Sequence, residues 1–323
     1  MNKLKWLIKR ELWEHKGMLL WTPVVIGAVM TALAAAMLLF STQGAHFQSQ
    51  LMVNGQVTDL HHMGGFLEGG APADVAAVLA KHYLDATTPL FIVMGILIFF
   101  YCLSALYHDR RDRSLLFWKS LPVSDRLTVA SKLATALVVA PLITSAVALA
   151  SGLAMLIMLA LTMSARHFNV IGPLLASPDL YLGPLRLLGM WPIYFLWALP
   201  TVGWLLMVSA WARSKVFLWA VGSPLLIAML GVWAQKTLQP ALDIAWYMRH
   251  IVGHLLLGLI PGSWFMRDRF GGRALADAGD ASLSSLSGPA WDVLGTPSLW
   301  LGAAAGVLML YVAIRLRRWR DAS

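Results

Sequence analysis

Two histidines, His250 and His254, are the residues of this chain whose spacing most directly suggests metal chemistry. Histidines four positions apart lie on one face of a helix and can bind the same metal ion. Asp243 lies about two helical turns earlier, and no further ligand stands at a suitable spacing. We therefore favour polar anchoring at an interface over metal binding for these histidines, and also for His61 and His62.

Motifs for catalysis and for ATP hydrolysis are missing from the sequence. It contains no GxxxxGK[ST] phosphate-binding loop and no Gly-rich loop followed by a suitable lysine. No nucleophile–base pair, paired carboxylates or cofactor box stands out, so we expect a chain that is not an enzyme and binds no cofactor or metal of its own. The single cysteine, Cys102, excludes an intrachain disulfide.

Three tryptophans, Trp197, Trp204 and Trp211, recur at intervals of seven residues. On a helix this spacing places them near one face, with a drift of ~20° per heptad. They could form an aromatic wall along the path of an amphipathic substrate. Packing inside the protein or at the membrane interface explains the same stripe, and we favour that interpretation.

The most informative stretch is a charged segment, residues 109–126, between two long apolar segments. Residues 110–121 can form about three helical turns before Pro122 stops the helix. Ser124 is then well placed to cap the next helix. A loop that only keeps positive charge on one side of a membrane needs neither Trp118 nor paired leucines. The segment is therefore suited to receive force from a partner that the chain does not itself contain.

The composition indicates that the elements which position these residues are membrane helices. The chain is 59% hydrophobic and 13% charged, with a mean hydropathy of +0.68, whereas soluble domains carry about 25% charged residues. The net charge of +9 does not indicate nucleic-acid binding, because the basic residues flank apolar segments as membrane topology requires.

We predict an all-α integral membrane protein with six transmembrane helices, since six segments can cross about 30 Å of hydrocarbon. The predicted spans are residues 18–40, 89–107, 133–163, 187–211, 216–235 and 297–314. The expected outer loops are residues 41–88, 164–186 and 236–296, and the main cytoplasmic loop is residues 108–132. The expected domains are an N-terminal helix at residues 1–17 and a single six-span domain at residues 18–323.

The distribution of basic residues predicts the orientation. By these boundaries 17 of the 25 Lys and Arg residues fall on one side, which places both termini in the cytoplasm. Residues 241–260 are apolar on average but contain Asp243, Arg249, His250 and His254, which are costly at mid-bilayer. We therefore predict a re-entrant or interfacial segment there, ended by Pro261 and Gly262.

The N-terminal segment predicts an amphipathic helix lying in the membrane interface. Leu4, Leu7, Ile8 and Leu12 follow helical spacing, and basic residues occupy other faces. Its expected interfacial residues are Trp6, Arg10, Glu11 and Trp13. Contact with membrane lipid and contact with a protein partner both fit this helix.

At the charged segment the chain resembles the permease subunits of type-2 ABC transporters. Their first cytoplasmic loop carries an acidic–Arg pair, a small hydroxyl residue, leucines, and Ser-Leu-Pro-Val-Ser before a basic residue and a lysine. The matching residues are Asp112, Arg113, Ser114, Leu115, Leu116, residues 120–124, Arg126 and Lys132. Two residues depart from this pattern: Asp125 is inserted before the Arg, and Asp112 stands where many members have Glu. These departures question the sub-family more than the class of transporter.

The resemblance implies the membrane subunit of an ATP-driven exporter in the inner (plasma) membrane. Residues 110–121 would be a coupling helix, and a separate ATPase subunit, where ATP and Mg²⁺ bind, would dock on residues 108–126. The implied coupling residues are Arg110, Arg111, Asp112, Arg113, Leu116, Trp118, Lys119, Leu121 and Pro122. The resemblance also implies a dimer with a second permease copy or a paralogue.

Two other classes of membrane protein stay open at this point. One is a secondary carrier or channel, although the six predicted spans carry no Asp, Glu, Lys or Arg in their cores, where ion-coupled carriers usually keep such groups. The other is a membrane anchor that recruits an ATPase without transporting anything.

Overall fold

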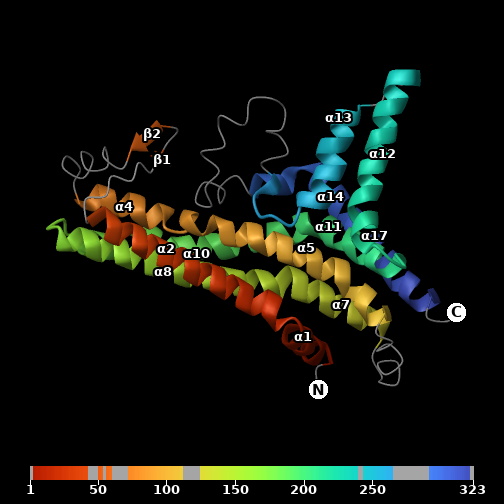
Figure 1. Ribbon diagram of the computed structural model, residues 1–323, viewed down its shortest axis with the longest axis horizontal. Coiled ribbons are helices and arrows are strands. Elements are labelled where there is room, and N and C mark those ends of the chain that lie inside the picture. Colours follow the sequence, from red (N-terminus) through yellow and green to blue (C-terminus); the bar gives the residue numbers. More distant parts are fainter. Residues whose placement is uncertain are drawn as a thin grey trace.

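The structure is a computed structural model that describes most of the chain (Figure 1). The described residues are 3–42, 50–53, 56–59, 72–111, 124–238, 243–264 and 291–320.

Six helices of the described chain are long and apolar enough to cross a membrane, which confirms the prediction of a multi-pass membrane protein. They are Gly17–Phe40, Pro72–Asp109, Asp125–Ala165, Pro178–Trp211, Val216–Thr237 and Pro297–Arg318. Three of them have 34, 38 and 41 residues. At ~1.5 Å per residue these three are longer than the ~30 Å hydrocarbon layer, so they carry structure out of the membrane.

The first part of the chain contains two of the spans and the segments around them. Its elements are α1 (Lys3–Glu14), the π-helical turn η1 (Gly17–Trp21), α2 (Thr22–Thr42), β1 (Gln50–Val53), β2 (Gln56–Asp59), α4 (Pro72–His82), the 3-10 turn η2 (Asp85–Thr87) and α5 (Thr88–Arg111). Strands β1 and β2 form an antiparallel hairpin in which Gln50 lies opposite Asp59. Helix α4 begins at Pro72, inside the segment predicted as the first outer loop.

The second part of the chain contains the other four spans. Its elements are α7 (Asp125–Ala134), the π-helical turn η3 (Thr135–Val139), α8 (Ala140–Ala165), α9 (Ile171–Ala176), α10 (Pro178–Gly189), α11 (Trp191–Trp211), α12 (Val216–Leu238), α13 (Ile244–Tyr247), the π-helical turn η4 (Met248–Val252), α14 (Gly253–Leu257), the 3-10 turn η6 (Trp291–Gly295) and α17 (Pro297–Arg320). Ser124 caps α7 as predicted, because its side chain accepts a hydrogen bond from the Leu127 backbone N–H at 3.4 Å.

Helix α11 lies at the centre of the fold, with α5, α14 and α17 packed around it. Most of its residues are buried. It approaches α17 backbone to backbone, because a Cβ built on Gly203 would lie 2.6 Å from the Gly306 carbonyl oxygen. Small residues permit such close approach between membrane helices, where packing rather than the hydrophobic effect drives association.

Two segments predicted as outer loops contain regular structure. Residues 41–88 include the β1–β2 hairpin, so the described chain is not entirely helical. Residues 164–186 contain α9 and most of α10, and the fourth span begins at Pro178 rather than near 187. Hydropathy missed α9 and α10 because each is short and packs its buried face on other outer segments, including α4.

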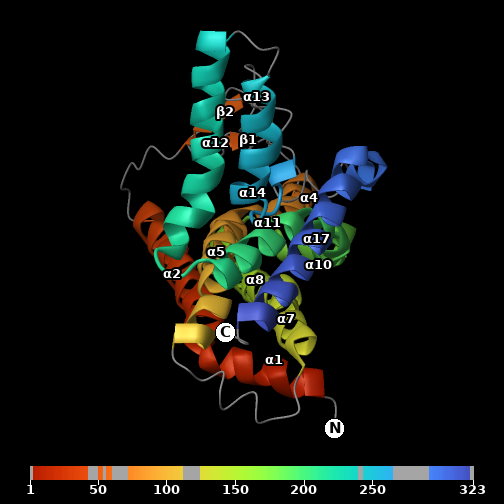
Figure 2. The same ribbon diagram turned by 90° about the vertical axis from the view of Figure 1, so that its right-hand side faces the viewer.

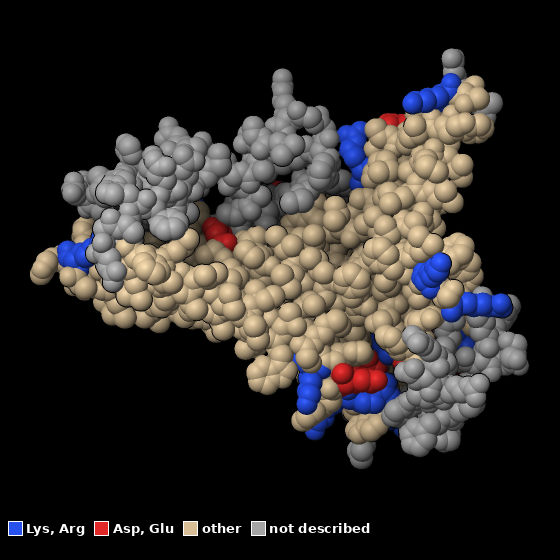
Figure 3. All heavy atoms as spheres, in the orientation of Figure 1, with Lys and Arg blue, Asp and Glu red and all other residues tan. Residues whose placement is uncertain are grey.

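Helices α2, α5 and α8 share a direction, and the charges gather at the ends of the molecule (Figure 1 and Figure 3). Helices α2, α5 and α8 run along the long axis, whereas α12 runs across it (Figure 1). The middle of the visible face carries few charged side chains, and a group of acidic and basic residues lies near α1 and α7 (Figure 3). Ion pairs link this group to Arg317, near the end of α17, so both ends of the described chain lie at one end of the fold.

Candidate functional site

A buried ion pair between Glu11 and Lys132 stands at the centre of this charged group. The Lys132 Nζ atom donates to both carboxylate oxygens of Glu11, at 3.1 and 3.3 Å, and these side chains are 2% and 0% exposed. The Arg10 guanidinium donates to Glu11 Oε1 at 2.9 Å, and the Tyr101 hydroxyl donates to Oε2 at 2.9 Å. Charges are buried in proteins when they are paired and hydrogen-bonded in this way.

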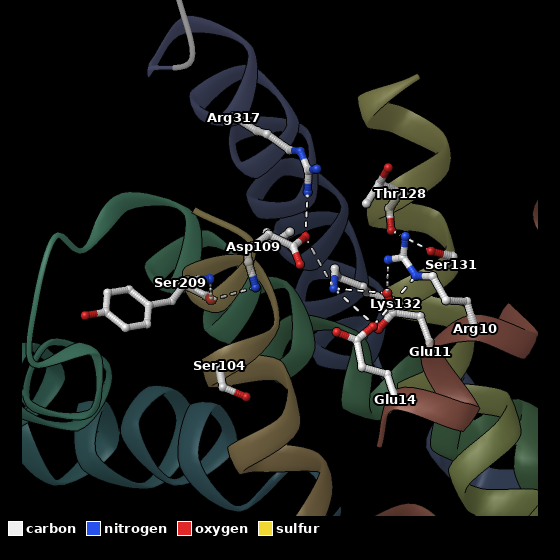
Figure 4. Close-up of polar contacts among 12 residues, drawn as sticks. Arg10, Glu11, Glu14, Ser104, Asp109, Thr128, Ser131, Lys132, Ser209 and Arg317 are labelled. Carbon is white, nitrogen blue, oxygen red and sulfur yellow. Dashed lines mark hydrogen bonds and ion pairs between the residues drawn. The ribbon is translucent and has the colours of Figure 1, made fainter. Parts of the chain in front are cut away.

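The network continues from Lys132 through Asp109 to the last span. The Lys132 Nζ atom lies 3.5 Å from Asp109 Oδ2, and the same oxygen accepts from Arg317 Nη1 at 3.2 Å. Arg317 also donates through Nε to Asp125 Oδ1 at 3.2 Å. We call Arg10, Glu11, Asp109, Asp125, Lys132 and Arg317 the charge cluster; they come from the four helices α1, α5, α7 and α17. Figure 4 shows Arg10, Glu11, Asp109, Lys132 and Arg317 pointing toward one another.

The charge cluster holds both ends of the segment that the sequence singles out. Asp109 lies near the end of α5 and Asp125 begins α7, so residues 112–123 connect two helices that the cluster fixes. The end of α5 is also tied to α11, because the Ser209 hydroxyl oxygen accepts from the Leu106 and Tyr107 backbone N–H groups at 3.1 and 3.0 Å. A displacement of residues 112–123 would therefore act on α1, α11 and α17 together.

Burial and nearby charges shift the pKa of Glu11 in the charge cluster and of His15 just after α1. Burial alone would raise the pKa of Glu11, but the Lys132 ammonium and the Arg10 guanidinium outweigh it and bring the pKa below the ordinary 4.5. Burial lowers the pKa of His15 below the ordinary 6.5, and the nearby Glu11 carboxylate opposes this shift only in part. His15 packs edge-on against Tyr101.

We expect the free energy of unfolding to decrease in two steps as the pH falls. The unfolded chain binds a proton at His15 more readily than the folded chain, so stability declines below about pH 6.5. The contribution of Glu11 is present above about pH 4.5 and is lost as the pH falls through its lower folded pKa. Thermal unfolding in detergent between pH 8 and 4 measures the first step and the onset of the second.

A His15→Gln variant should lose the upper step, and the matched His250→Gln variant should keep it. An unchanged pH profile in His15→Gln would show that another group causes the step.

The charge cluster joins four helices through paired charges. Three acidic and three basic side chains balance within the charge cluster, so it needs no external ion to neutralise it. Across the part of the chain that the structure describes, no group of three or more His, Cys, Asp or Glu side chains could hold a metal ion. Buried ion pairs contribute little net stability but can specify how elements fit together.

Most of the predicted coupling residues lie outside the described residues. These are Asp112, Arg113, Leu116, Trp118, Lys119, Leu121 and Pro122. Arg110 and Arg111 form the end of α5, where only their backbone is described. The structure therefore describes the two anchors of the segment and not the segment itself.

The predicted residues of α1 divide between its two faces. Arg10 and Glu11 belong to the charge cluster, and Glu11 is buried together with Leu7 against the protein. Trp6 and Trp13 are 47% and 63% exposed. Glu11 was predicted among the interfacial residues of this helix, and its partners in the charge cluster were not predicted. Glu11 lies on the apolar face of the helix, seven residues after Leu4, and a carboxylate on that face requires a partner. This position in the sequence could have indicated a buried ion pair.

The predicted tryptophan stripe contacts three different neighbours along α11. Trp197 is 2% exposed and its indole N–H donates to the Ser263 hydroxyl at 2.9 Å. Trp204 is partly buried and Trp211 packs edge-on against Trp219 of α12. The substrate path remains a prediction, and the packing interpretation accounts for each of these contacts.

Trp204 supplies a hydrogen bond that α12 cannot make internally. Pro224 has no backbone N–H, so the Ala220 carbonyl four residues earlier lacks its helical donor. The Trp204 indole N–H donates to this carbonyl at 3.1 Å. The contact links the central helix to α12 at the position where proline interrupts the hydrogen-bond ladder.

Trp204→Phe should therefore destabilise the protein by about 1–3 kcal/mol, because it keeps an aromatic ring but leaves the carbonyl unpaired. Thermal unfolding measures the change, with Trp211→Phe as the more exposed control. If transport changes while stability does not, the substrate-path interpretation is favoured.

His250 and His254 use their ring nitrogens to bond backbone carbonyls. His254 Nε2 lies 2.8 Å from the Trp197 carbonyl oxygen and the ring stacks on Trp197 at 4.1 Å. His250 Nδ1 lies 3.0 Å from the Trp246 carbonyl oxygen. These contacts favour the anchoring interpretation over a metal site.

Residues 243–264 form a short helical segment that returns against α11. The Tyr194 hydroxyl donates to the Leu259 carbonyl at 3.0 Å, beyond the end of α14. Gly262 has a φ of 86°, which favours glycine, and turns the chain next to the buried Ser263. Non-helical backbone at membrane depth requires partners of this kind.

Comparison with known proteins adds no relative: no family model, no curated protein and no solved structure matches this chain.

Proposed function

We propose that the chain is the membrane-spanning permease subunit of an ATP-driven exporter of the type-2 ABC class. A separate ATPase subunit would dock on residues 108–126 and supply the energy. The single observation that carries this proposal is the charge cluster, which fixes both helices flanking that segment to α1 and to the last span. The sequence pattern of residues 112–124 supports the same function.

Force on the docking segment would have a direct route into the membrane helices. Residues 112–123 begin just after the Asp109 anchor in α5 and end just before the Asp125 anchor in α7. Helix α7 continues without interruption into the third span, as the single helix Asp125–Ala165. A partner that moves the segment would thus tilt α5 and the α7–α8 helix relative to the centrally packed α11.

The remaining parts of the proposal follow from this function. Helix α1 would lie in the membrane interface, residues 110–121 would form the coupling helix, and the 243–264 segment would be re-entrant or interfacial. Both termini would be cytoplasmic and the membrane would be the inner (plasma) membrane. The working assembly would pair this chain with a second permease copy or a paralogue and with ATPase subunits that bind ATP and Mg²⁺.

The test is purification of the tagged chain from its native membrane, followed by reconstitution in liposomes with any ATPase that accompanies it. Trp118→Ala and Arg113→Glu should uncouple ATP hydrolysis, because interface energy concentrates in a few aromatic and Arg anchors worth about 2 kcal/mol or more each. Arg213→Glu, a charge reversal on another loop, is the matched control and should leave hydrolysis and transport intact.

Three outcomes would contradict the proposal in distinguishable ways. Transport without any ATPase favours a secondary carrier or channel. A bound ATPase whose hydrolysis never drives transport favours a non-transporting anchor. Normal coupling in both loop variants would remove the docking segment from the mechanism.

A further inference from the structure

Helix α1 presents two faces of different chemistry because the charge cluster fixes its rotation. Leu7 and Glu11 are buried against the protein, and Glu11 is held by Lys132 of α7. The opposite side of the helix consists of exposed or largely exposed residues. We call this side, together with the exposed Lys16 just after the helix, the outward face of α1; its residues are Lys5, Trp6, Lys9, Trp13 and Lys16.

The outward face combines positive charge with amphipathic aromatic rings. Three lysines lie on it, and the Lys16 Nζ atom stands 5.6 Å from the centre of the Trp13 ring. Trp13 is 63% exposed, although a ring of this size is usually buried in a protein core. The one acid on the solvent side of α1 is Glu14, which is paired with Arg10 at 3.7 Å.

The outward face of α1 ends where the first span begins. The span begins at Gly17, directly after Lys16, and its exposed apolar residues start with Leu20 and Trp21. Helix α1 turns away from the direction of α2 at this boundary (Figure 2). Lysines and tryptophans at this depth lie where phospholipid headgroups begin.

We propose that the outward face of α1 binds the headgroups of anionic phospholipids. A basic face with tryptophans is complementary to a negatively charged headgroup layer with an apolar layer beneath it. An acidic surface on a protein partner would match the lysines, but the position of Trp13 and Lys16 directly before the first span favours lipid headgroups. The proposal concerns lipid chemistry and is independent of whether an ATPase binds.

The experiment uses the full chain, purified in neutral detergent and titrated with dioleoyl phosphatidylglycerol or dioleoyl phosphatidylcholine. Native mass spectrometry counts the bound lipids and gives an apparent Kd for each. The test variant is Lys5→Gln/Lys9→Gln/Lys16→Gln. The control variant, Arg213→Gln/Lys215→Gln/Arg318→Gln, removes the same charge from exposed residues that the sequence places on the same side of the membrane.

We expect wild type to prefer phosphatidylglycerol and the α1 variant to lose at least tenfold in affinity for it. Each lysine near an anionic surface contributes about fivefold, and raising the salt concentration should reduce the preference. The control variant and phosphatidylcholine binding should change little. Circular dichroism verifies that both variants remain folded, as exposed Lys→Gln changes should allow.

Equal losses in the two variants would show general attraction of a basic protein to anionic lipid and would overturn the site. Absence of any preference for phosphatidylglycerol in wild type would overturn it as well. If the α1 variant keeps its lipid affinity but no longer co-purifies with an ATPase, the face is a protein contact and the proposal fails.

Discussion

Lys132→Ala should destabilise the protein by about 3–5 kcal/mol, the cost of leaving a buried charge without its partner. The Glu11 carboxylate would keep its bonds to Arg10 and Tyr101 but would lose the ammonium that contacts both of its oxygens. Asp109 would lose its contact with Lys132 at the same time. Thermal and chemical unfolding in detergent would show the loss, and the yield from membranes should decrease.

The double variant Glu11→Gln/Lys132→Met should recover most of this stability, since neither buried side chain then carries a charge. Such recovery makes the two substitutions strongly non-additive, as expected for residues in one network. Lys9→Ala, an exposed lysine on α1, is the control and should change stability by about 0.5 kcal/mol or less. A Lys132→Ala variant as stable as the Lys9→Ala variant would show that the charge cluster is not formed.

The coupling of ATP hydrolysis to transport should differ between the double variant and wild type even if the two proteins are equally stable. The neutral pair can fill the space but cannot hold α1 against α7 by charge. If the cluster transmits movement of residues 112–123, the restored protein should bind the ATPase yet respond weakly in transport. Normal transport in this variant would assign the cluster to folding alone.

Gly306→Val should cost about 1–3 kcal/mol or more, because it forces apart the two most closely packed helices. A Cβ on Gly306 would lie 2.7 Å from the Leu199 carbonyl carbon and from the Pro200 nitrogen, and both of these are backbone atoms. Side chains can rotate away from a new methyl group, but the backbone of α11 can move only as part of the helix. The effect should appear as a lower unfolding temperature.

The matched control for this prediction is Gly222→Ala in α12, where the nearest atom to an added Cβ is a side-chain carbon at 3.7 Å. That change should be neutral or stabilising, since alanine favours a helix over glycine by about 1 kcal/mol. Comparable losses in Gly306→Val and Gly222→Ala would contradict a special contact between α11 and α17.

Local sequence patterns predicted the parts of the fold that depend on local chemistry. The six spans follow from runs of apolar residues, and the cap at Ser124 follows from one hydroxyl before a helix. The chain turns at Gly262, as the Pro-Gly pair predicted, although helix α14 already ends at Leu257. Each of these features is determined within about one element, so composition and spacing suffice.

Tertiary structure alone decided which distant residues meet. Lys132 lies 121 positions from Glu11, and Arg317 lies 208 positions from Asp109, so no spacing rule relates them. The sequence by itself predicted the six membrane-crossing helices and singled out the charged segment between two of them. Only the packing of α1, α5, α7 and α17 decided that the two helices flanking this segment are joined by a buried charge cluster, because a buried charge selects its partner by proximity in space and not by separation along the chain.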